Sequence, residues 1–213
     1  MAIKVKICGL TNIEDALWAV RAGADALGFV FAPSSRRVDL ESARGIIKAL
    51  PPFISKVGVF VNEETRKIEE ISRYVGLDTL QFHGDESPEY CSIFNTFKII
   101  KAFAVREEED GLWEEVEKYR GSVDAILLDT YVPGKPGGTG ELFPWERALS
   151  IKDCGPFILA GGLTPENVRE AIRVFRPYGV DVSSGVENQI KGIKDKNKIV
   201  EFILNVRRSE YDS

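Results

Sequence analysis

Eight short apolar runs, each followed by a segment with helical spacing, most constrain how this chain can fold. The runs span residues 3–7, 26–31, 56–61, 79–83, 98–103, 124–129, 157–160 and 179–182. Short apolar runs bounded by turn residues are typical of buried strands, whereas the segments between them carry apolar residues at intervals of three and four, as helices do. Strands that alternate with helices predict a parallel sheet covered by helices.

Helix-end signals support this division of the chain. Thr11 with Glu14 predicts a capping box at the start of the first helix, and Gly23 predicts its end. The Ser-Pro pair at 87–88 and the Thr-Pro pair at 164–165 each predict an N-cap followed by proline at the first helical position. The sixth helical segment, residues 144–150, is the shortest and carries the weakest pattern.

Eight strand-and-helix units predict a closed parallel (β/α)₈ barrel, the TIM-barrel fold, as one domain over residues 1–213. The length of 213 residues and the hydrophobic content of 44% suit a single core of this size. An open doubly wound sheet is the alternative, but no GxGxxG motif follows the first strand.

Composition excludes several kinds of partner. The net charge of -5 predicts no general attraction to nucleic acid or to anionic membranes. No apolar run is long enough to span a bilayer, and no signal peptide precedes the first strand. Cys8, Cys91 and Cys154 are too far apart in the sequence to indicate a zinc site, and a reduced cytoplasm is the expected location.

Polar residues and glycines cluster where the predicted strands end. In a barrel of this type, functional residues follow the carboxyl ends of the strands. The residues at those ends are Cys8 and Gly9, Pro33 to Arg37, Gln81 to Gly84, Asp129, Gly161 and Gly162, and Ser183 to Gly185. The strands that lead to them are mostly apolar, so these positions are the candidates for a site built on the scaffold.

Two adjacent loops predict a phosphate site. Two glycines follow the seventh strand, and Ser-Ser-Gly follows the eighth, each leading toward a helical turn. Unpaired backbone N–H groups at such positions favour an anion, and this barrel commonly binds phosphate between these two loops. Gly162, Ser184 and Gly185 are the predicted donors. The alternative for either loop alone is an ordinary tight turn.

Seven motifs along the chain resemble those of one enzyme family. They are VKICGLT, GADALGFVFAPSSRR, VGVFVN, LQFHGDE, LLDT with GGTG, GGLTPENV and GVDVSSGVE, in that order. Together they resemble the phosphoribosylanthranilate isomerases of tryptophan biosynthesis, from about residue 3 to residue 206. The resemblance implies an Amadori rearrangement of a phosphorylated N-ribosyl anthranilate to the 1-(2-carboxyphenylamino)-1-deoxyribulose 5-phosphate, without cofactor or metal.

The resemblance assigns roles to three side chains. Asp129 matches the general acid, a role that requires it to keep a proton near neutral pH, which desolvation under a closing loop would favour. Cys8 matches the general base, and a nearby helix start or cation such as Lys6 is expected to lower the pKa of its thiol. Arg37 matches the residue that holds the substrate carboxylate, although strand parity cannot separate it from Arg36 in a loop.

Four further side chains are expected to support the pocket. Lys6 shares the strand parity of Cys8, and we expect it either to pair with Asp181 on the neighbouring strand or to hold a thiolate. Gln81 and His83 share a strand face directed at the site, and His83 has either a structural role or a role in proton transfer.

The loop after Asp129 is rich in glycine, with Gly137, Gly138 and Gly140 close together. Such a loop can close over a substrate and exclude water. We therefore predict a lid, with a flexible connector as the alternative.

Rival functions fit the residues less well. A ribulose-phosphate epimerase would need several histidines for a metal, and the chain has only His83. Indole-glycerol-phosphate synthase would need a Lys–Glu pair; Lys101 is available, but Cys8 and Asp129 would then have no role. A phosphate-binding barrel without catalysis would need neither of them. The expected partner is a small phosphorylated substrate, and the expected assembly is a monomer or a homodimer.

Overall fold

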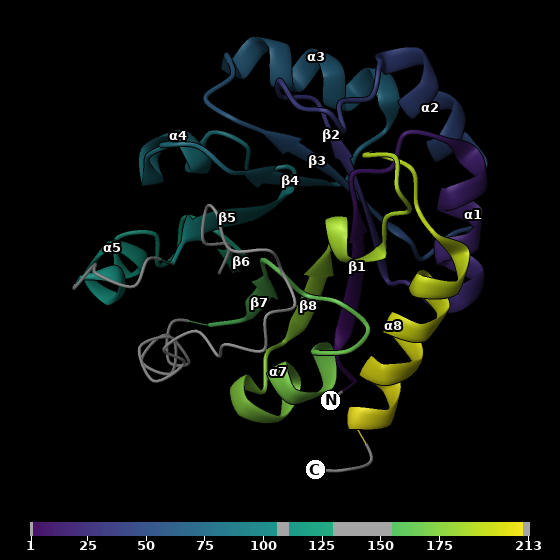
Figure 1. Cartoon of the computed structure of the whole chain (residues 1–213). Helices are drawn as coiled ribbons and strands as arrows, with labels where there is room; N and C mark the ends of the chain where they lie inside the picture. Colours follow the sequence, from purple (N-terminus) through teal and green to yellow (C-terminus); the bar gives the residue numbers. More distant parts are fainter. Residues whose placement is uncertain (1, 106–110, 130–154, 211–213) are drawn as a thin grey trace.

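The structure is a computed structural model that describes residues 2–105, 111–129 and 155–210. Eight parallel strands close into a barrel in sequence order, which confirms the predicted (β/α)₈ fold over the open sheet (Figure 1). The strands are β1 (Lys4–Cys8), β2 (Ala26–Val30), β3 (Ser55–Phe60), β4 (Thr79–Phe82), β5 (Lys98–Ala104), β6 (Ala125–Asp129), β7 (Phe157–Ala160) and β8 (Gly179–Val182).

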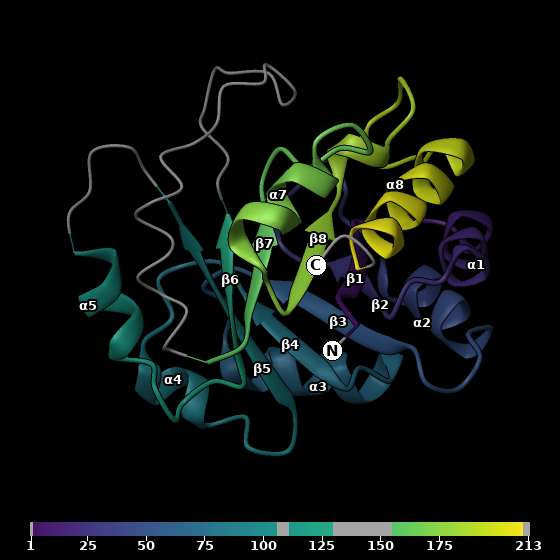
Figure 2. The same cartoon turned by 90° about the horizontal axis from the view of Figure 1, so that it is seen from below.

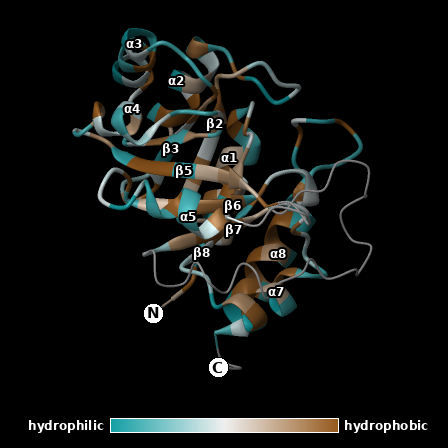
Figure 3. Ribbon diagram, turned by 90° about the vertical axis from the view of Figure 1, so that its left-hand side faces the viewer, coloured by the Kyte–Doolittle hydropathy of each residue, from teal (hydrophilic) through white to brown (hydrophobic). Residues whose placement is uncertain are grey.

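The helices surround the strands, as the two views at right angles show (Figures 1 and 2). They are α1 (Ile13–Ala22), α2 (Leu40–Lys48), α3 (Thr65–Val75), α4 (Pro88–Ser92), α5 (Leu112–Glu117), α7 (Val168–Phe175), the short 3₁₀ helix η2 (Ser184–Val186) and α8 (Lys196–Ser209). Colouring by hydropathy shows that these helices carry both hydrophobic and hydrophilic residues along their length (Figure 3). Within the described parts of the chain, no helix combines the length and the apolar character needed to cross a membrane.

Two of the predicted helix-end signals are confirmed and two are wrong. Gly23 ends α1 in the left-handed conformation, with φ of 104°, and Ser87 caps α4 with proline at the first helical position. The predicted capping box at Thr11 is displaced by one residue. Asn12 is the N-cap: its Oδ1 accepts from the Asp15 N–H and its Nδ2 donates to the Asp15 carboxylate. The Thr11 hydroxyl instead donates to the Gly192 carbonyl, 2.8 Å away.

The predicted start of α7 is also wrong. The helix begins at Val168, three residues after the proline of the Thr-Pro pair. The Asn167 side chain accepts from the Thr164 N–H and donates to the Gly162 carbonyl, which folds residues 164–167 into a turn. The helical segment predicted at 144–150 and the predicted lid glycines, Gly137, Gly138 and Gly140, lie outside the described residues, as does Cys154.

The core has two layers. The larger one lies between the strands and the helices, and a smaller one fills the barrel interior with Val57, Ile100, Ala102, Leu127, Ile158 and Ala160. Paired residues of neighbouring parallel strands share a face, and side chains alternate between faces along each strand. The register pairs Asp129 with Ala160, Gln81 with Ile100, Cys8 with Gly28 and Lys6 with Asp181. These pairings put the polar candidates on the interior face of the barrel.

Candidate active site

The predicted residues surround the carboxyl end of the barrel. Cys8 ends β1, Arg37 follows β2, His83 follows β4, and Asp129 ends β6. In the closed sheet β1 lies between β8 and β2, whereas β6 is three strands away from β1, past β8 and β7. Cys8 and Asp129 therefore approach the mouth of the barrel from nearly opposite sides.

Cys8 is enclosed by charged groups. Its side chain is buried, and Lys6, two residues earlier on the same face, donates from Nζ to Asp181 Oδ2 at 2.7 Å. Burial raises the pKa of the Cys8 thiol; the Lys6 ammonium lowers it by less, and the Asp181 carboxylate raises it further. The expected lowering is therefore wrong for this structure. The thiol is held mainly as its neutral form, next to a cation that can stabilise the thiolate.

Lys6 and Asp181 form the pair predicted from strand parity. Burial disfavours the charged form of Lys6, but the Asp181 carboxylate, with a smaller contribution from Cys8, holds the pKa of Lys6 above its ordinary value. The other oxygen of Asp181, Oδ1, is buried and has no hydrogen-bond partner within the described part of the structure. This oxygen can accept a hydrogen bond from a group that enters the barrel mouth.

Asp129 lies beside His83. The imidazole Nε2 is 3.3 Å from Asp129 Oδ2, and Nδ1 is 3.4 Å from the amide nitrogen of Gln81. Gln81 is buried, whereas the side chains of His83 and Asp129 are 35% and 25% exposed. The three side chains form a row from the barrel interior to the mouth, and the role of His83 beside Asp129 stays a prediction.

The two adjacent arginines have different environments. Arg36 donates Nε and Nη2 to the two carboxylate oxygens of Glu187, at 2.6 and 2.9 Å. Arg37 is exposed and lies close enough to Glu63 to help Lys67 lower the pKa of that carboxyl. Tertiary structure therefore separates residues that parity could not: Arg36 is paired with Glu187, whereas Arg37 is exposed.

The loops after β7 and β8 are in contact, as a shared phosphate site requires. Gly185 packs so closely on the loop after β7 that a Cβ placed on it would lie 1.9 Å from the Leu163 carbonyl oxygen. Gly162 adopts a positive φ of 62°, and its carbonyl is held by Asn167. Backbone N–H donation to phosphate from Gly162, Ser184 and Gly185 stays a prediction.

Sequence reasoning missed three ion pairs near the site, two made by Glu187 and one made by Lys101. Glu187, 5% exposed, contacts Arg36 and Lys194; it is the last residue of the motif GVDVSSGVE, a signal that went unused. Lys101 lies 3.3 Å from Glu86, both fully buried. Lys101 in a strand and Lys194 in a charged segment showed no pattern in the sequence that indicates burial.

Lys101 does not face the barrel interior. It pairs in register with Phe82 and Ile126, which belong to the layer between strands and helices. Its Nζ donates to the carbonyls of Gly84 and Ala102, at 2.7 and 3.0 Å. Lys101 and Glu86 therefore support the loop after β4, and they cannot form the acid–base pair of a synthase site.

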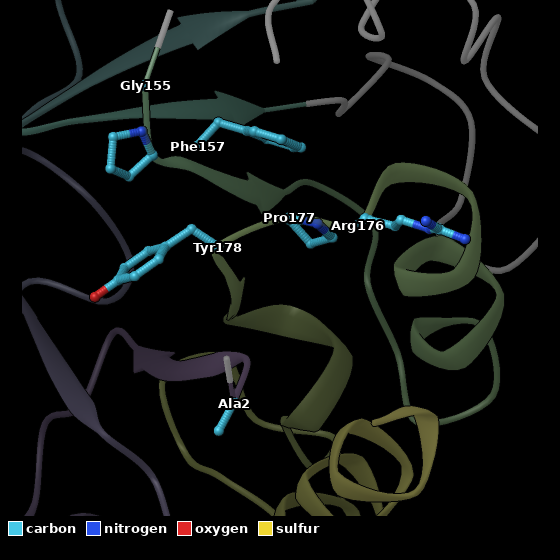
Figure 4. A pocket seen from close by; sticks show the side chains of 7 residues that line it. Ala2, Gly155, Phe157, Arg176, Pro177 and Tyr178 are labelled. Atoms are coloured by element: carbon cyan, nitrogen blue, oxygen red, sulfur yellow. The ribbon is translucent and has the colours of Figure 1, made fainter. Parts of the chain in front are cut away.

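Two cavities lie at the opposite end of the barrel from the site. One of about 380 Å³ is lined by Ala2, Gly155, Pro156, Phe157, Arg176, Pro177 and Tyr178 (Figure 4). A second of about 540 Å³ is lined by residues where strands begin, including Lys4, Ser55, Thr79 and Lys98. Neither contains Cys8, Asp129 or Arg37, so the chemistry of the site does not involve them. In the described residues no group of three or more His, Cys, Asp or Glu gathers as a metal site.

Comparison with known proteins gives one answer over nearly the whole chain. Residues 5–205 match the family model of N-(5'-phosphoribosyl)anthranilate (PRA) isomerase. The Desulforudis audaxviator N-(5'-phosphoribosyl)anthranilate isomerase is 52% identical over 205 residues, 96% of this chain and 98% of that protein.

Two solved structures agree with this match. A phosphoribosyl anthranilate isomerase in complex with reduced 1-(o-carboxyphenylamino)-1-deoxyribulose 5-phosphate superposes with a TM-score of 0.85, at 46% identity, covering 97% of this chain and 99% of that one. Monomers of the dimeric Thermotoga maritima enzyme superpose with a TM-score of 0.84, at 44% identity and the same coverage.

Proposed function

The chain belongs to the N-(5'-phosphoribosyl)anthranilate isomerase family of tryptophan synthesis, and we propose that Cys8 and Asp129 are the base and the acid of its reaction. The observation that carries this proposal is their placement. Both side chains share the interior face of the barrel and come from strands on nearly opposite sides of its mouth. A sugar bound between them would have one group on each side.

The reaction needs one proton donor and one proton acceptor. Asp129 donates a proton to the ring oxygen of the ribose, which opens the ring to an iminium. Cys8, as the thiolate, then removes the proton from C2 of the sugar and leaves an enolamine, which tautomerises to the ketone. The iminium accepts the electron pair released at C2. General acid–base groups placed in this way typically contribute factors of about 10²–10⁴ each to the rate.

The order of the loops around the mouth supports one substrate orientation. The phosphate is bound by the backbone of Gly162, Ser184 and Gly185 after β7 and β8, and the anthranilate carboxylate by Arg37 after β2. Because β1 lies between β8 and β2, Cys8 stands between the two anchors. The ribose carbons that exchange protons join the two ends of the substrate, so this orientation brings them to the thiol.

The decisive experiment measures turnover of freshly generated phosphoribosylanthranilate by its fluorescence, using metal-free protein. The native chain should consume the substrate rapidly, while Cys8→Ser and Asp129→Asn should each lose at least about 100-fold in kcat. Cys91→Ser is the matched control, because Cys91 is a buried free thiol that lies on helix α4 and not at a strand end of the site.

Each outcome is informative. If both variants are inactive and the control is active, the assignment of base and acid holds. A native protein no faster than buffer would contradict the catalytic function, and retained affinity for phosphate ligands would then indicate a binding protein. An active Cys8→Ser variant would contradict only the assignment of Cys8 as the base and would leave the isomerase activity itself standing.

We expect the enzyme to work in the cytoplasm, where free thiols such as Cys8 and Cys91 stay reduced. The similar Thermotoga maritima protein is described as dimeric, and a homodimer is the assembly that we propose for this chain. Light scattering on the purified protein separates a homodimer from a monomer by a factor of two in mass.

A further inference from the structure

Glu187 is the most highly connected buried carboxylate near the site. It follows the 3₁₀ helix η2, and its N–H donates to the Ser184 carbonyl at 3.0 Å. Its side chain accepts from Arg36 at two atoms and from the Gly192 N–H at 3.0 Å. Lys194 Nζ approaches the same carboxylate at 3.3 Å. The proposed reaction uses none of these groups.

One side of this network holds the loop after β2. The paired guanidinium and carboxylate form a bidentate fork, the geometry that fixes both partners most firmly. The Arg36 side chain lies across Gly9, where an added Cβ would be 2.8 Å from Arg36 Cδ. Arg36 is thereby fixed in position, and the backbone N–H of its chain neighbour Arg37 donates to the Ser34 carbonyl at 3.2 Å within the same loop.

The other side of the network holds the loop after β8. Lys194, whose side chain is fully buried, donates to the Ser183 carbonyl at 3.0 Å. The Ser183 hydroxyl in turn donates to the Cys8 carbonyl at 3.1 Å. Burial disfavours the charged form of Glu187, but Arg36, Lys194 and the Gly192 N–H together hold the pKa of its carboxyl below the ordinary value. The carboxylate is therefore ionised and joins the two loops near neutral pH.

We propose that Glu187 is a positioning residue that holds Arg36 and so leaves Arg37 fixed for the substrate carboxylate, at a set distance from the phosphate loop. This proposal rests on the proposed function of Arg37 and of the loops after β7 and β8. Glu187 touches no reacting atom. It acts on binding by keeping the two anchors at the spacing of one two-ended substrate, and rigid anchors lose less affinity to conformational ordering.

The test compares three ligands on native protein and on Glu187→Gln. They are reduced 1-(o-carboxyphenylamino)-1-deoxyribulose 5-phosphate, its N-phenyl counterpart without the carboxylate, and inorganic phosphate. We expect the preference for the carboxylated ligand over its counterpart to fall about tenfold in Glu187→Gln, with phosphate affinity changed less than about twofold. The KM should rise about tenfold while kcat changes less than about threefold, because Cys8 and Asp129 are untouched.

Matched variants separate positioning from general damage. Glu170→Gln removes an exposed pair with Arg173 on α7 and should change nothing measured. Arg37→Met should abolish the carboxylate preference. Arg36→Met should lower this preference by about the same factor as Glu187→Gln. The double variant Arg36→Met/Glu187→Gln should lower it no further than either single variant, because the two residues act as one pair.

Three results would overturn the proposal. Equal weakening of all three ligands in Glu187→Gln means that the residue only supports the fold. An unchanged carboxylate preference in that variant means that Glu187 does not position Arg37. A preference that survives Arg37→Met means that another group binds the carboxylate. Failure of the proposed function looks different, since the native protein would then show no carboxylate preference at all.

Discussion

At the scale of single residues, Gly28 on β2 makes room for the proposed base. A Cβ at this position would lie 2.7 Å from Cys8 Sγ and 3.1 Å from Lys6 Cε, both closer than van der Waals contact allows. The space that glycine leaves in the second strand is therefore filled by the reactive thiol of the first. A small displacement of a catalytic group can cost about 100-fold in rate.

We predict that Gly28→Ala lowers kcat by about 100-fold, because the added methyl group displaces the Cys8 thiol, while KM changes little. Steady-state kinetics together with far-UV circular dichroism tests this. The control is Gly45→Ala in α2, where an added Cβ meets no atom within 4 Å and kcat should stay native. Native kcat in a folded Gly28→Ala variant would show that the thiol position is not critical.

The raised pKa of the Cys8 thiol predicts how activity depends on pH. Below that pKa, each unit of pH increases the thiolate fraction tenfold, so kcat/KM should rise with pH along its base-controlled limb. Asp181→Asn removes a negative charge that raises this pKa and frees Lys6 to stabilise the thiolate. The limb should therefore move to lower pH. A limb that stays in place or moves upward would contradict the thiolate as the base.

At the scale of elements, the start of α1 shows that a sequence can predict a side-chain N-cap correctly and still place it one residue away from its true position. Both Thr11 and Asn12 can cap a helix, and Asn12 does so because its side chain exchanges two hydrogen bonds with Asp15. Asp15 also accepts from the Lys194 N–H at 2.8 Å, so a contact distant in sequence fixes the register of the cap. The same cap orders the helix that follows Cys8.

Asn12→Ala should lower the free energy of unfolding by about 1 kcal/mol, the usual cost of losing a side-chain N-cap. Urea denaturation measures the difference. Asn197→Ala in α8 removes an exposed asparagine and should change stability by less than about 0.5 kcal/mol. If Asn12→Ala is as stable as this control, the cap does not determine the start of the helix.

At the scale of the whole molecule, one device recurs around the amino-terminal end of the barrel. An aspartate directly before each of the strands β2, β4 and β6 accepts from a backbone N–H of the preceding strand and pairs with a lysine. The aspartates are Asp25, Asp78 and Asp124; the N–H groups are those of Val5, Lys56 and Ile99; the lysines are Lys4, Lys56 and Lys98. The repeat ties neighbouring strands together at the end of the barrel opposite the site.

Asp25 makes this device sensitive to acid. Burial disfavours its charge, but Lys4, the Val5 N–H and Arg207 outweigh burial and lower the pKa of its carboxyl. The folded state therefore binds this proton less readily than the unfolded state. The stabilisation is present above the ordinary value of about 3.9 and is lost as the pH falls from there through the folded pKa.

Chemical denaturation at several pH values should show this contribution. Asp25→Asn should be less stable than the native chain at neutral pH, and the difference should shrink below about pH 4. Glu70→Gln removes an exposed pair with Arg66 on α3 and should differ little from native throughout. A difference between Asp25→Asn and the native chain that does not change with pH would contradict the electrostatic origin.

The sequence by itself predicted the barrel, because buried parallel strands and their helices leave local patterns that repeat eight times along the chain. It also predicted the face of Lys6, Cys8 and Asp181, since side chains alternate along a strand and the order of strands in a barrel follows the chain. Chemistry at the strand ends, with the family motifs, predicted the family to which the chain belongs.

Tertiary structure alone decided which arginine is paired, which residue caps α1, and that the Lys101 side chain faces away from the barrel interior. Arg36 meets Glu187 across 151 residues, and Lys194 meets Asp15 across 179. Burial of the Cys8 thiol also depends on this packing, and it reversed the expected direction of its pKa shift. Such contacts depend on how loops from different strands meet at the barrel mouth, and a loop without periodicity carries no local signal of its distant neighbours.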